Sequence, residues 1–345
     1  MELTTVWFIL IAAMWTAYLV LEGFDFGVGM LMTILGRNDV ERRVILNTIG
    51  PFWDGNEVWL VVAGAGTFAA FPEWYATLFS GFYFPLFLIL VALIIRAVAI
   101  DYRGKRDGMR WRRGWDISIF VGSFLPTVLW AVALANIVHG VPIDANKEYV
   151  GGFFNLLNPY ALLAAVTVLA LFLVHGAVFI GLKTTGDVRE RANRFALRMG
   201  LAAILPAVAF VGWTTIDAGK IAATIIGGAA LLAFVGGLLA IVKDRDGWAF
   251  LGTAFAIGLS VVMLFVSLFP NVMPSSLNPA WNLTTTNAAA TDYTLTIMTW
   301  VALLFTPLVV LYQSWSYWVF RKRIGVEHIP TSPAPSNSTQ SNSTP

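Results

Sequence analysis

Four carboxyls and one guanidinium stand inside otherwise apolar stretches of this chain. They are Glu22, Asp25, Asp54, Glu57 and Arg96. A charged group in hydrocarbon costs several kcal/mol unless it is neutralised, paired or hydrated. One guanidinium cannot neutralise four carboxylates, so some of these acids must be protonated or hydrated. Groups in that state are what a proton path through a membrane requires, and we predict that these five residues belong to one.

The spacing of the acids indicates which way they face. Within each acidic pair the two residues are three apart, which places both carboxyls on one face of a helix. Gly23 and Gly27, on the same segment as the first pair, form a small-xxx-small pattern that permits close contact between helices. We therefore expect the carboxyls to face the interior of a helix bundle.

Simpler explanations are available for two of these residues. Asp54 stands near the start of a predicted helix, where the helix dipole favours an acid. Arg96 stands close to the end of another helix and can extend its guanidinium to the lipid headgroups. Glu22 is harder to explain in this way, because it lies nearly a full helix away from the point where its segment enters the membrane.

The remaining candidate ligands predict no metal or haem site in this chain. The sequence contains no cysteine, which excludes disulfides and thiolate chemistry. His139 and His175 are isolated in predicted helices, where histidine more often packs than binds haem, and His328 falls in the C-terminal tail. No nucleotide-binding loop appears, and no nucleic-acid partner is expected. Four aspartates beside basic residues are expected to balance charge at the membrane surface: Asp101, Asp116, Asp187 and Asp246.

Composition identifies the elements that position these residues as membrane-spanning helices. Hydrophobic residues make up 58% of the 345 and charged residues 12%, whereas soluble domains have about 25% charged residues. Runs of about 20 apolar residues mark spanning helices. We predict nine, at residues 5–34, 52–71, 75–100, 116–139, 159–182, 197–215, 221–242, 248–269 and 294–320. The first begins without a basic segment or a small-residue cleavage site, so we expect it to remain as a helix.

The chain is therefore predicted to be an all-α polytopic membrane protein with a single domain. The nine-helix transmembrane domain covers residues 1–323. Residues 324–345 are polar, proline-rich and without apolar periodicity. Such a composition cannot bury enough apolar surface to fold, so we predict a disordered cytoplasmic tail.

The positions of the basic residues predict the orientation. Nineteen of the 22 Lys and Arg residues fall on alternate connections between predicted spans, and the other connections contain only Lys147 and Lys220. Because cytoplasmic connections are enriched in Lys and Arg, the N-terminus is predicted outside and the C-terminus in the cytoplasm. At about 1.5 Å per residue, the five ionisable residues then lie at a similar depth, in the cytoplasmic half of three consecutive helices.

Several motifs, in the same order along the chain, resemble subunit II of the cytochrome bd quinol oxidases. They are GFDFGVGM, LGRNDVERR, GPFWDGNEVWLV, FSGFYFPL, RAVAIDYR, NPYALLA, LFPNVMPSS and MTWVALLFTPLVVLYQSWSYW. By motif, Glu22 and Asp25 match the two acids of the family's first helix, although the family commonly has Asp at the first of these positions. Asp54 matches the acid of WDGN, and Arg96 matches the arginine before DYR.

The resemblance implies a subunit of a terminal respiratory oxidase that oxidises quinol and reduces dioxygen to water in the bacterial cytoplasmic membrane. Subunit I carries haem b and haem d in this family. Subunit II has two four-helix bundles and one peripheral helix, and binds no haem. It packs against subunit I, is implied to contribute a cytoplasmic proton route, and can hold a structural quinone. A small accessory subunit and membrane lipid are further partners that the resemblance allows.

Two other interpretations are open on the residues alone. A secondary transporter also carries charges inside its membrane domain, although its site lies near the midplane, whereas these acids lie toward the cytoplasmic half. A purely structural scaffold for subunit I would contain buried ion pairs as well. The sequence leaves the conduit and scaffold roles of the acids open, and the resemblance allows either ubiquinol or menaquinol as the donor.

Overall fold

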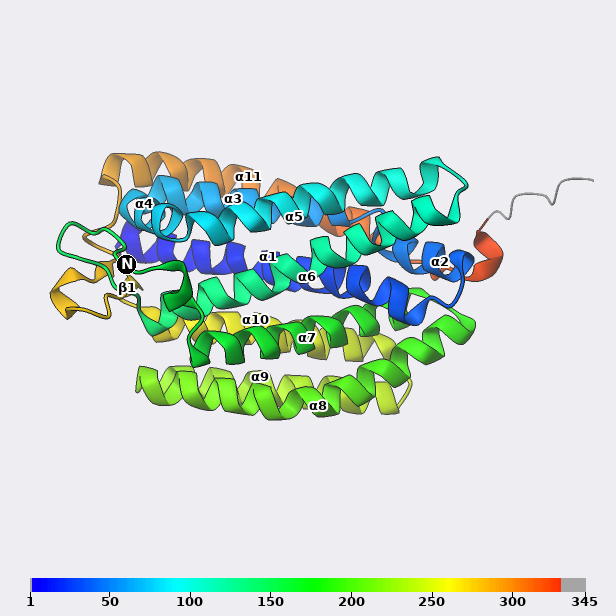
Figure 1. The fold of residues 1–345 in the computed structure, drawn as a ribbon. Coiled ribbons are helices and arrows are strands. Elements are labelled where there is room, and N and C mark those ends of the chain that lie inside the picture. Colours follow the sequence, from blue (N-terminus) through cyan, green and yellow to red (C-terminus); the bar gives the residue numbers. More distant parts are fainter. Residues whose placement is uncertain (1, 330–345) are drawn as a thin grey trace, which may run out of the picture.

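The computed structural model describes residues 2–329, which form a layered bundle of long helices running along one direction (Figure 1). The all-α prediction is confirmed. Eight of the described helices are long and apolar enough to cross a membrane. They are α1 (Leu3–Leu35), α5 (Tyr83–Tyr102), α6 (Met109–His139), α7 (Pro159–Lys183), α8 (Gly186–Ala218), α9 (Ile221–Val242), α10 (Asp246–Leu268) and α11 (Asp292–Val319).

The second predicted span corresponds to α3 (Trp53–Ala70), an 18-residue helix that lies beside α1 and α11. Its first turn, WDGNE, is polar. This polar turn lowers the mean hydropathy of α3, and α3 is absent from the eight spans identified by length and composition.

The third predicted span, residues 75–100, is divided into two helices. They are α4 (Pro72–Gly81) and α5, and the helical conformation is interrupted at Phe82. Pro85 has no N–H to donate to the carbonyl of Gly81, so a continuous helix would lose a hydrogen bond here. Gly81 also packs so closely on Tyr149 that a Cβ atom would lie 2.5 Å from the tyrosine side chain.

A predicted loop, residues 36–51, instead contains a helix, α2 (Asp39–Ile49). The Asn38 side chain accepts a hydrogen bond from the Glu41 amide at 2.9 Å, which is the usual way to cap a helix start. Asp39 and Glu41 in the first turn also suit the helix dipole. Hydropathy alone misses α2 because only one side of it is apolar.

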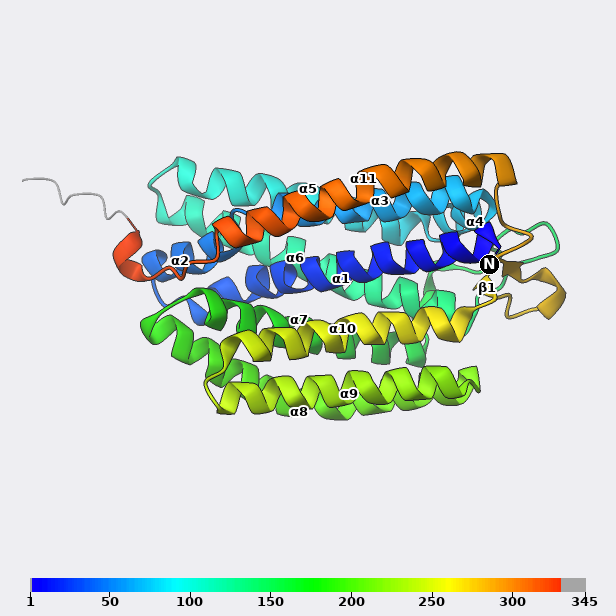
Figure 2. The same cartoon turned by 180° about the vertical axis from the view of Figure 1, so that it is seen from behind.

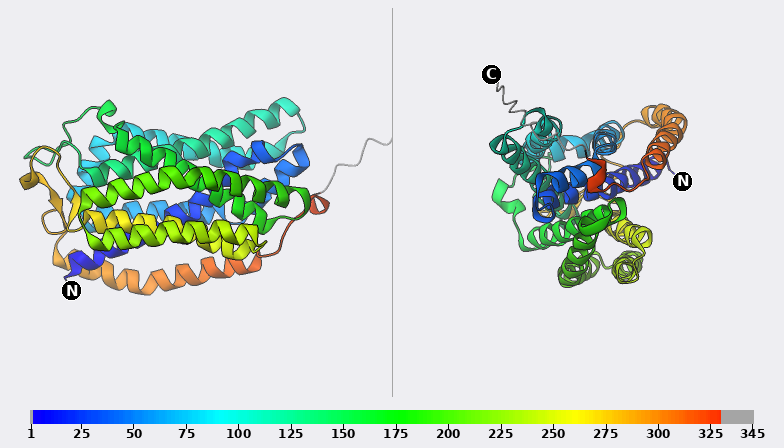
Figure 3. Two further views of the ribbon diagram at one scale, coloured as in Figure 1. Left: turned by 90° about the horizontal axis from the view of Figure 1, so that it is seen from below. Right: turned by 90° about the vertical axis from the view of Figure 1, so that its right-hand side faces the viewer.

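The first helix lies at the centre of the molecule, and the views from front and back agree on this (Figures 1 and 2). Seen end-on, α7, α8, α9 and α10 gather on one side of α1, while α11 lies at the edge of the other (Figure 3). The predicted glycine contact occurs between α1 and α7. A Cβ atom on Gly27 would lie 2.1 Å from the Phe172 carbonyl oxygen, and Gly176 meets Gly27 backbone to backbone.

Irregular segments close the end of the molecule that holds the N-terminus. A short antiparallel pair, β1 (Asn271–Met273) and β2 (Leu283–Thr284), lies there. The two lysines of the sparsely basic connections are at this end. Lys147 donates to the Asn287 carbonyl at 3.1 Å, and Lys220 donates to the carbonyls of Val266 and Ser267 at the end of α10. Burial lowers the pKa of Lys220.

The chain after α11 turns back across the opposite end of the molecule. The Ile324 amide donates to the Lys183 carbonyl at 2.9 Å, and a short helix, η4 (Val326–His328), follows beside α2. Residues 324–329 of the predicted tail are thus tied to the helices. The rest of the predicted tail, 330–345, lies outside the described residues.

Candidate functional site: a buried cluster of acids around Arg96

Arg96 is the centre of a buried ion-pair cluster. Its Nη1 atom lies 2.6 Å from Oε2 of Glu22 and 3.0 Å from Oε1 of Glu57. The side chains of Arg96 and Glu22 are fully buried, and that of Glu57 is 21% exposed. Three of the five predicted residues, from α1, α3 and α5, therefore meet directly.

Small and aromatic neighbours determine where the guanidinium lies. Gly122 on α6 allows close packing, because a Cβ atom there would lie 2.7 Å from Cβ of Arg96. The guanidinium carbon lies 4.7 Å from the centre of the Phe26 ring, within range of a cation–π contact. Arg96 is thus held inside the helix packing, and the alternative in which it extends to the headgroups is wrong for this structure.

Asp25 is equally buried but has a different partner. It accepts a hydrogen bond of 2.7 Å from Nδ2 of Asn56 on α3. The Asn56 amide oxygen accepts in turn from Nε2 of Gln313 and from the Tyr317 hydroxyl, both at 2.9 Å and both on α11. Asn56 therefore connects the first helix with the last.

Sequence reasoning missed Asn56, Gln313 and Tyr317. A signal was present for Asn56, which lies between the two acids of WDGNE. Gln313 and Tyr317 belong to an aromatic segment, YQSWSYW, that resembles an ordinary interfacial belt. Their role depends on contacts with a residue more than 250 positions away, so periodicity could not reveal it.

The structure does not bring Asp54 into the cluster. Its side chain is exposed in the first turn of α3. Within the described residues it has no recorded hydrogen bond or ion pair. Asp54 lies on the same helix as Glu57, three residues nearer to its start, and of these two acids only Glu57 forms an ion pair with Arg96 among the described residues.

Several polar atoms of the cluster have no protein partner. Among the described residues, Oε1 of Glu22, Oδ1 of Asp25, and Nε and Nη2 of Arg96 are buried without a hydrogen bond. Buried polar atoms in folded proteins are nearly always satisfied, by protein or by ordered water. Three buried or half-buried carboxyls also surround a single cation. Protons or water molecules are therefore needed to complete this cluster.

The histidines have other roles. His175 is fully buried on α7, where Nδ1 lies 2.7 Å from the Thr253 hydroxyl and Nε2 lies 3.2 Å from the Val20 carbonyl. Both ring nitrogens are thus engaged in hydrogen bonds within the helix bundle. His139 is partly exposed near Asp217 at the other end of the molecule. The described residues contain no group of three His, Cys, Asp or Glu side chains that could hold a metal ion.

Two of the four aspartates expected at the surface are buried. Asp116 lies between Arg42 at 2.9 Å and Arg103 at 2.5 Å, and Asp246 lies between Arg189 at 2.9 Å and Arg323 at 2.7 Å. Charge balance is confirmed as their role, but exposure is wrong, because arginines from separate segments fold over each carboxyl. Asp101 and Asp187 are exposed as expected.

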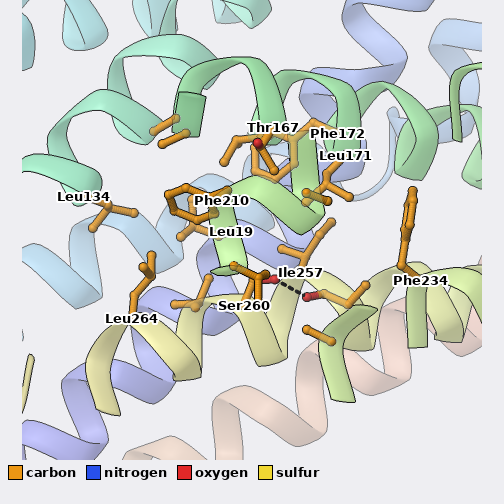
Figure 4. Close-up of a pocket in the computed structure, with 18 of the residues that line it drawn as sticks. Leu19, Leu134, Thr167, Leu171, Phe172, Phe210, Phe234, Ile257, Ser260 and Leu264 are labelled. Atoms are coloured by element: carbon orange, nitrogen blue, oxygen red, sulfur yellow. Dashed lines mark hydrogen bonds between the residues drawn. The ribbon is translucent and has the colours of Figure 1, made fainter. Parts of the chain in front are cut away.

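A second internal space lies among α1 and α6–α10, but its chemistry differs (Figure 4). It is a cavity of about 60 Å³ lined almost wholly by apolar side chains. The Ser260 hydroxyl donates to the Ala256 carbonyl on its own helix at 2.8 Å, and Thr167 likewise donates to Leu163. No acid or base lines this cavity, so the Arg96 cluster is the better candidate for proton chemistry.

The fold and the cluster together define a class, a helical membrane protein with charges buried between its own helices. The chain belongs to the cytochrome bd terminal oxidase subunit II family, whose sequence model matches residues 3–320. The resemblance inferred from the motifs is thereby confirmed. As a member of this family the chain is a subunit of an oxidoreductase complex.

Individual relatives agree with this assignment. The chain is 43% identical over 332 residues to cytochrome bd ubiquinol oxidase subunit 2 of Bacillus subtilis, covering 94% of this chain and 97% of the relative. It is 36% identical over 363 residues to cytochrome bd-I ubiquinol oxidase subunit 2 of Escherichia coli K12, covering 94% and 96%. The bd oxidase structure from Geobacillus thermodenitrificans has a similar fold, with a TM-score of 0.75 at 18% identity, covering 93% of this chain and 100% of that chain.

Proposed function

We propose that this chain supports the haem-bearing subunit I of a quinol oxidase and supplies a cytoplasmic path for the protons consumed when dioxygen is reduced to water. The observation that carries the proposal is the buried cluster in which three carboxyls surround Arg96 and Asn56. Carboxyls in excess of their cation, with unpartnered buried oxygens, suit groups that gain and lose protons.

The exposure of the acids suggests an order for the path. Asp54 is exposed at the start of α3, Glu57 is 21% exposed one turn further in, and Glu22 and Asp25 are fully buried. A proton would enter at Asp54, pass Glu57 and reach the buried pair Glu22 and Asp25, with Arg96 stabilising whichever carboxyl is ionised. Water molecules at the unpartnered oxygens would bridge the gaps between them.

The proposed direction of uptake depends on topology. We propose nine spans including α3, arranged as two four-helix bundles with α11 peripheral, with the N-terminus outside and the C-terminus in the cytoplasm of a bacterium. After Ile324, a fused reporter that works only in the cytoplasm should be active. Within residues 271–292, an inserted reporter that works only after export should be active. Reversal of either result would contradict the orientation.

Cofactors and further partners complete the proposal. Haem b and haem d would reside in subunit I, and quinol and dioxygen would be substrates of the whole complex. This chain would bind a quinone only in a structural role. An apolar groove of about 580 Å³ between α3, α4 and α5 would suit a quinone's hydrocarbon tail. A small accessory subunit and membrane lipid are the other proposed partners.

The test of the path compares neutral isosteres in the purified complex. Asp25→Asn and Glu22→Gln keep the shape of the side chain but remove the ionisable group. Oxygen consumption per haem should fall roughly a hundredfold, the scale of positioned proton-transfer groups. Oxygen consumption should fall less in Asp54→Asn, because bulk water can replace an exposed acid. Asp187→Asn, an exposed acid at the start of α8, is the matched control and should have no effect.

Two outcomes separate the path from its rivals. If Asp25→Asn and Glu22→Gln assemble with normal haem spectra and keep normal turnover and proton uptake, the path lies elsewhere and the scaffold role is correct. A secondary transporter would purify without a haem-bearing partner. Reduced-minus-oxidised spectra of the purified complex distinguish this case, because an oxidase shows the bands of haem b and haem d.

A further inference from the structure

A hollow of about 520 Å³ opens where α2 and α6 begin, at the end of the molecule that carries most basic residues. Side chains from both helix starts and from the preceding turn line it. They are Arg37, Asn38, Asp39, Arg42, Met109, Arg110, Arg112, Arg113 and Asp116. Arginines dominate this lining, so its charge balance decides what it can bind.

The acids of the hollow are already neutralised. Asp116 is held by Arg42 and Arg103, as described above. Asp39 lies 2.9 Å from Arg103 and 2.7 Å from Arg112. Arg112 also reaches Asp107 at 2.6 Å. These pairs consume the arginines that lie deepest in the hollow and leave no carboxylate of its lining unpaired.

Three arginines of the lining are left over. Arg37, Arg110 and Arg113 are exposed. In the part of the chain that the structure describes, their guanidinium groups have no recorded ion pair or hydrogen bond. The hollow therefore presents three uncompensated positive charges. A guanidinium matches the geometry of phosphate oxygens and can donate two parallel hydrogen bonds to them.

An apolar row continues from the hollow along α6. Met109, Arg113, Ile117 and Val121 are spaced four residues apart, so each side chain lies beside the next along the surface of the helix. Met109 is 88% exposed, Ile117 57% and Val121 41%. The row therefore carries a cation at its end and exposed apolar side chains farther into the membrane. That is the order of a headgroup and its acyl chain, and a free phosphate ion would use only the first part.

We propose that this hollow binds the headgroup of an anionic phospholipid of the cytoplasmic leaflet, with an acyl chain along Ile117 and Val121. Arg37, Arg110 and Arg113 would contact the phosphate. Basic pockets between helix ends on the cytoplasmic side are suited to such headgroups. The inference depends on the proposed orientation of this end, but not on the proton path.

The test measures lipid retention by the assembled complex. The R37Q/R110Q/R113Q variant removes the three free cations and leaves the ion pairs of Asp39 and Asp116 intact. A matched control, R198Q/K243Q/R245Q, removes three exposed cations from α8 and from the connection between α9 and α10. Each complex is stripped in detergent, titrated with phosphatidylglycerol or phosphatidylcholine, and examined by native mass spectrometry.

We expect wild type and control to retain one phosphatidylglycerol, and the triple variant to bind it about a hundredfold more weakly. Phosphatidylcholine should bind weakly to all three. If the triple variant fails to assemble, R37K/R110K/R113K supplies the comparison, since it keeps the charge and should bind with intermediate affinity. Equal retention by the variant and wild type would overturn the proposal. So would equal binding of phosphatidylcholine, or full displacement by millimolar inorganic phosphate, which would indicate a phosphate site.

Discussion

The two sides of α1 both bury polar side chains, but they satisfy them differently. On the side of α7–α10, His175 uses both ring nitrogens, and the Tyr160 hydroxyl lies 2.8 Å from that of Thr214. On the side of α3 and α5, the cluster around Arg96 keeps four unpartnered buried atoms on Glu22, Asp25 and Arg96. Among the described residues, no buried side-chain polar atom of α7–α10 lacks a hydrogen bond, so we call this side saturated and the other side unsatisfied.

This difference supports the proposed location of the proton path. A fully satisfied buried network stabilises one packing arrangement, whereas an unsatisfied buried polar atom costs free energy. Water or a proton removes this cost, and the proposed path requires both at the cluster. The saturated side is therefore expected to respond to mutation mainly through stability, and the unsatisfied side through turnover as well.

The largest effect is expected at Arg96. Arg96→Ala leaves the buried carboxyls without a cation, and breaking a buried ion pair in this way typically costs about 3–5 kcal/mol. The complex should assemble poorly and denature at a much lower temperature. Arg96→Lys keeps the charge but loses the shape of the guanidinium, so it should be intermediate. A normal denaturation temperature for Arg96→Ala would mean that the carboxyls are already neutral.

His175→Ala probes the saturated side. Removing a fully buried ring creates a cavity and breaks two hydrogen bonds, so we expect a loss of roughly 2–4 kcal/mol of stability. All haem bands and the turnover per haem should persist. His139→Ala, at a partly exposed position, is the control and should shift stability by less than about 0.5 kcal/mol. Loss of a haem band in His175→Ala would identify a ligand on this side.

The contact that joins α1 to the saturated side, between Gly27 and α7, is tested by substitution at Gly27. Gly27→Ala places a methyl group against the Phe172 carbonyl and Gly176, so α1 and α7 must move apart. Overpacking of this kind costs about 1–3 kcal/mol. Gly228→Ala on α9 meets no atom within 4 Å and should leave the denaturation temperature unchanged. If both variants behave alike, the backbone contact does not limit the packing.

Sequence patterns located Glu22, Asp25 and Arg96 because these residues stand in otherwise apolar runs. The pairing within the cluster was less accessible. Asp25 accepts a hydrogen bond from Asn56, and Asn56 accepts one from Gln313 on α11. No local spacing in the sequence indicates either contact. Asp116 looked like a surface group because Arg112 and Arg113 precede it in the sequence, yet Arg103 and Arg42 cover it.

Helix boundaries show the same limit. The apolar core of each long helix was predictable, because hydrocarbon thickness fixes the length of an apolar run. The polar turns beyond that core were not, and α8 begins at Gly186 although its predicted span begins at 197. Charged residues in this segment are good helix formers, so the helix continues past the apolar region that hydropathy detects.

The smallest effect is expected for Glu22→Asp, and it separates proton chemistry from geometry. This change keeps a carboxyl but shortens the side chain by one methylene, which lengthens the 2.6 Å contact with Arg96. If the position needs an ionisable group, turnover per haem should fall less than about tenfold in Glu22→Asp and roughly a hundredfold in Glu22→Gln. If the position needs only a correctly shaped hydrogen-bond partner, Glu22→Gln should be the milder change. Oxygen consumption by the two variants, each with a normal haem spectrum, decides between these cases, because their order reverses.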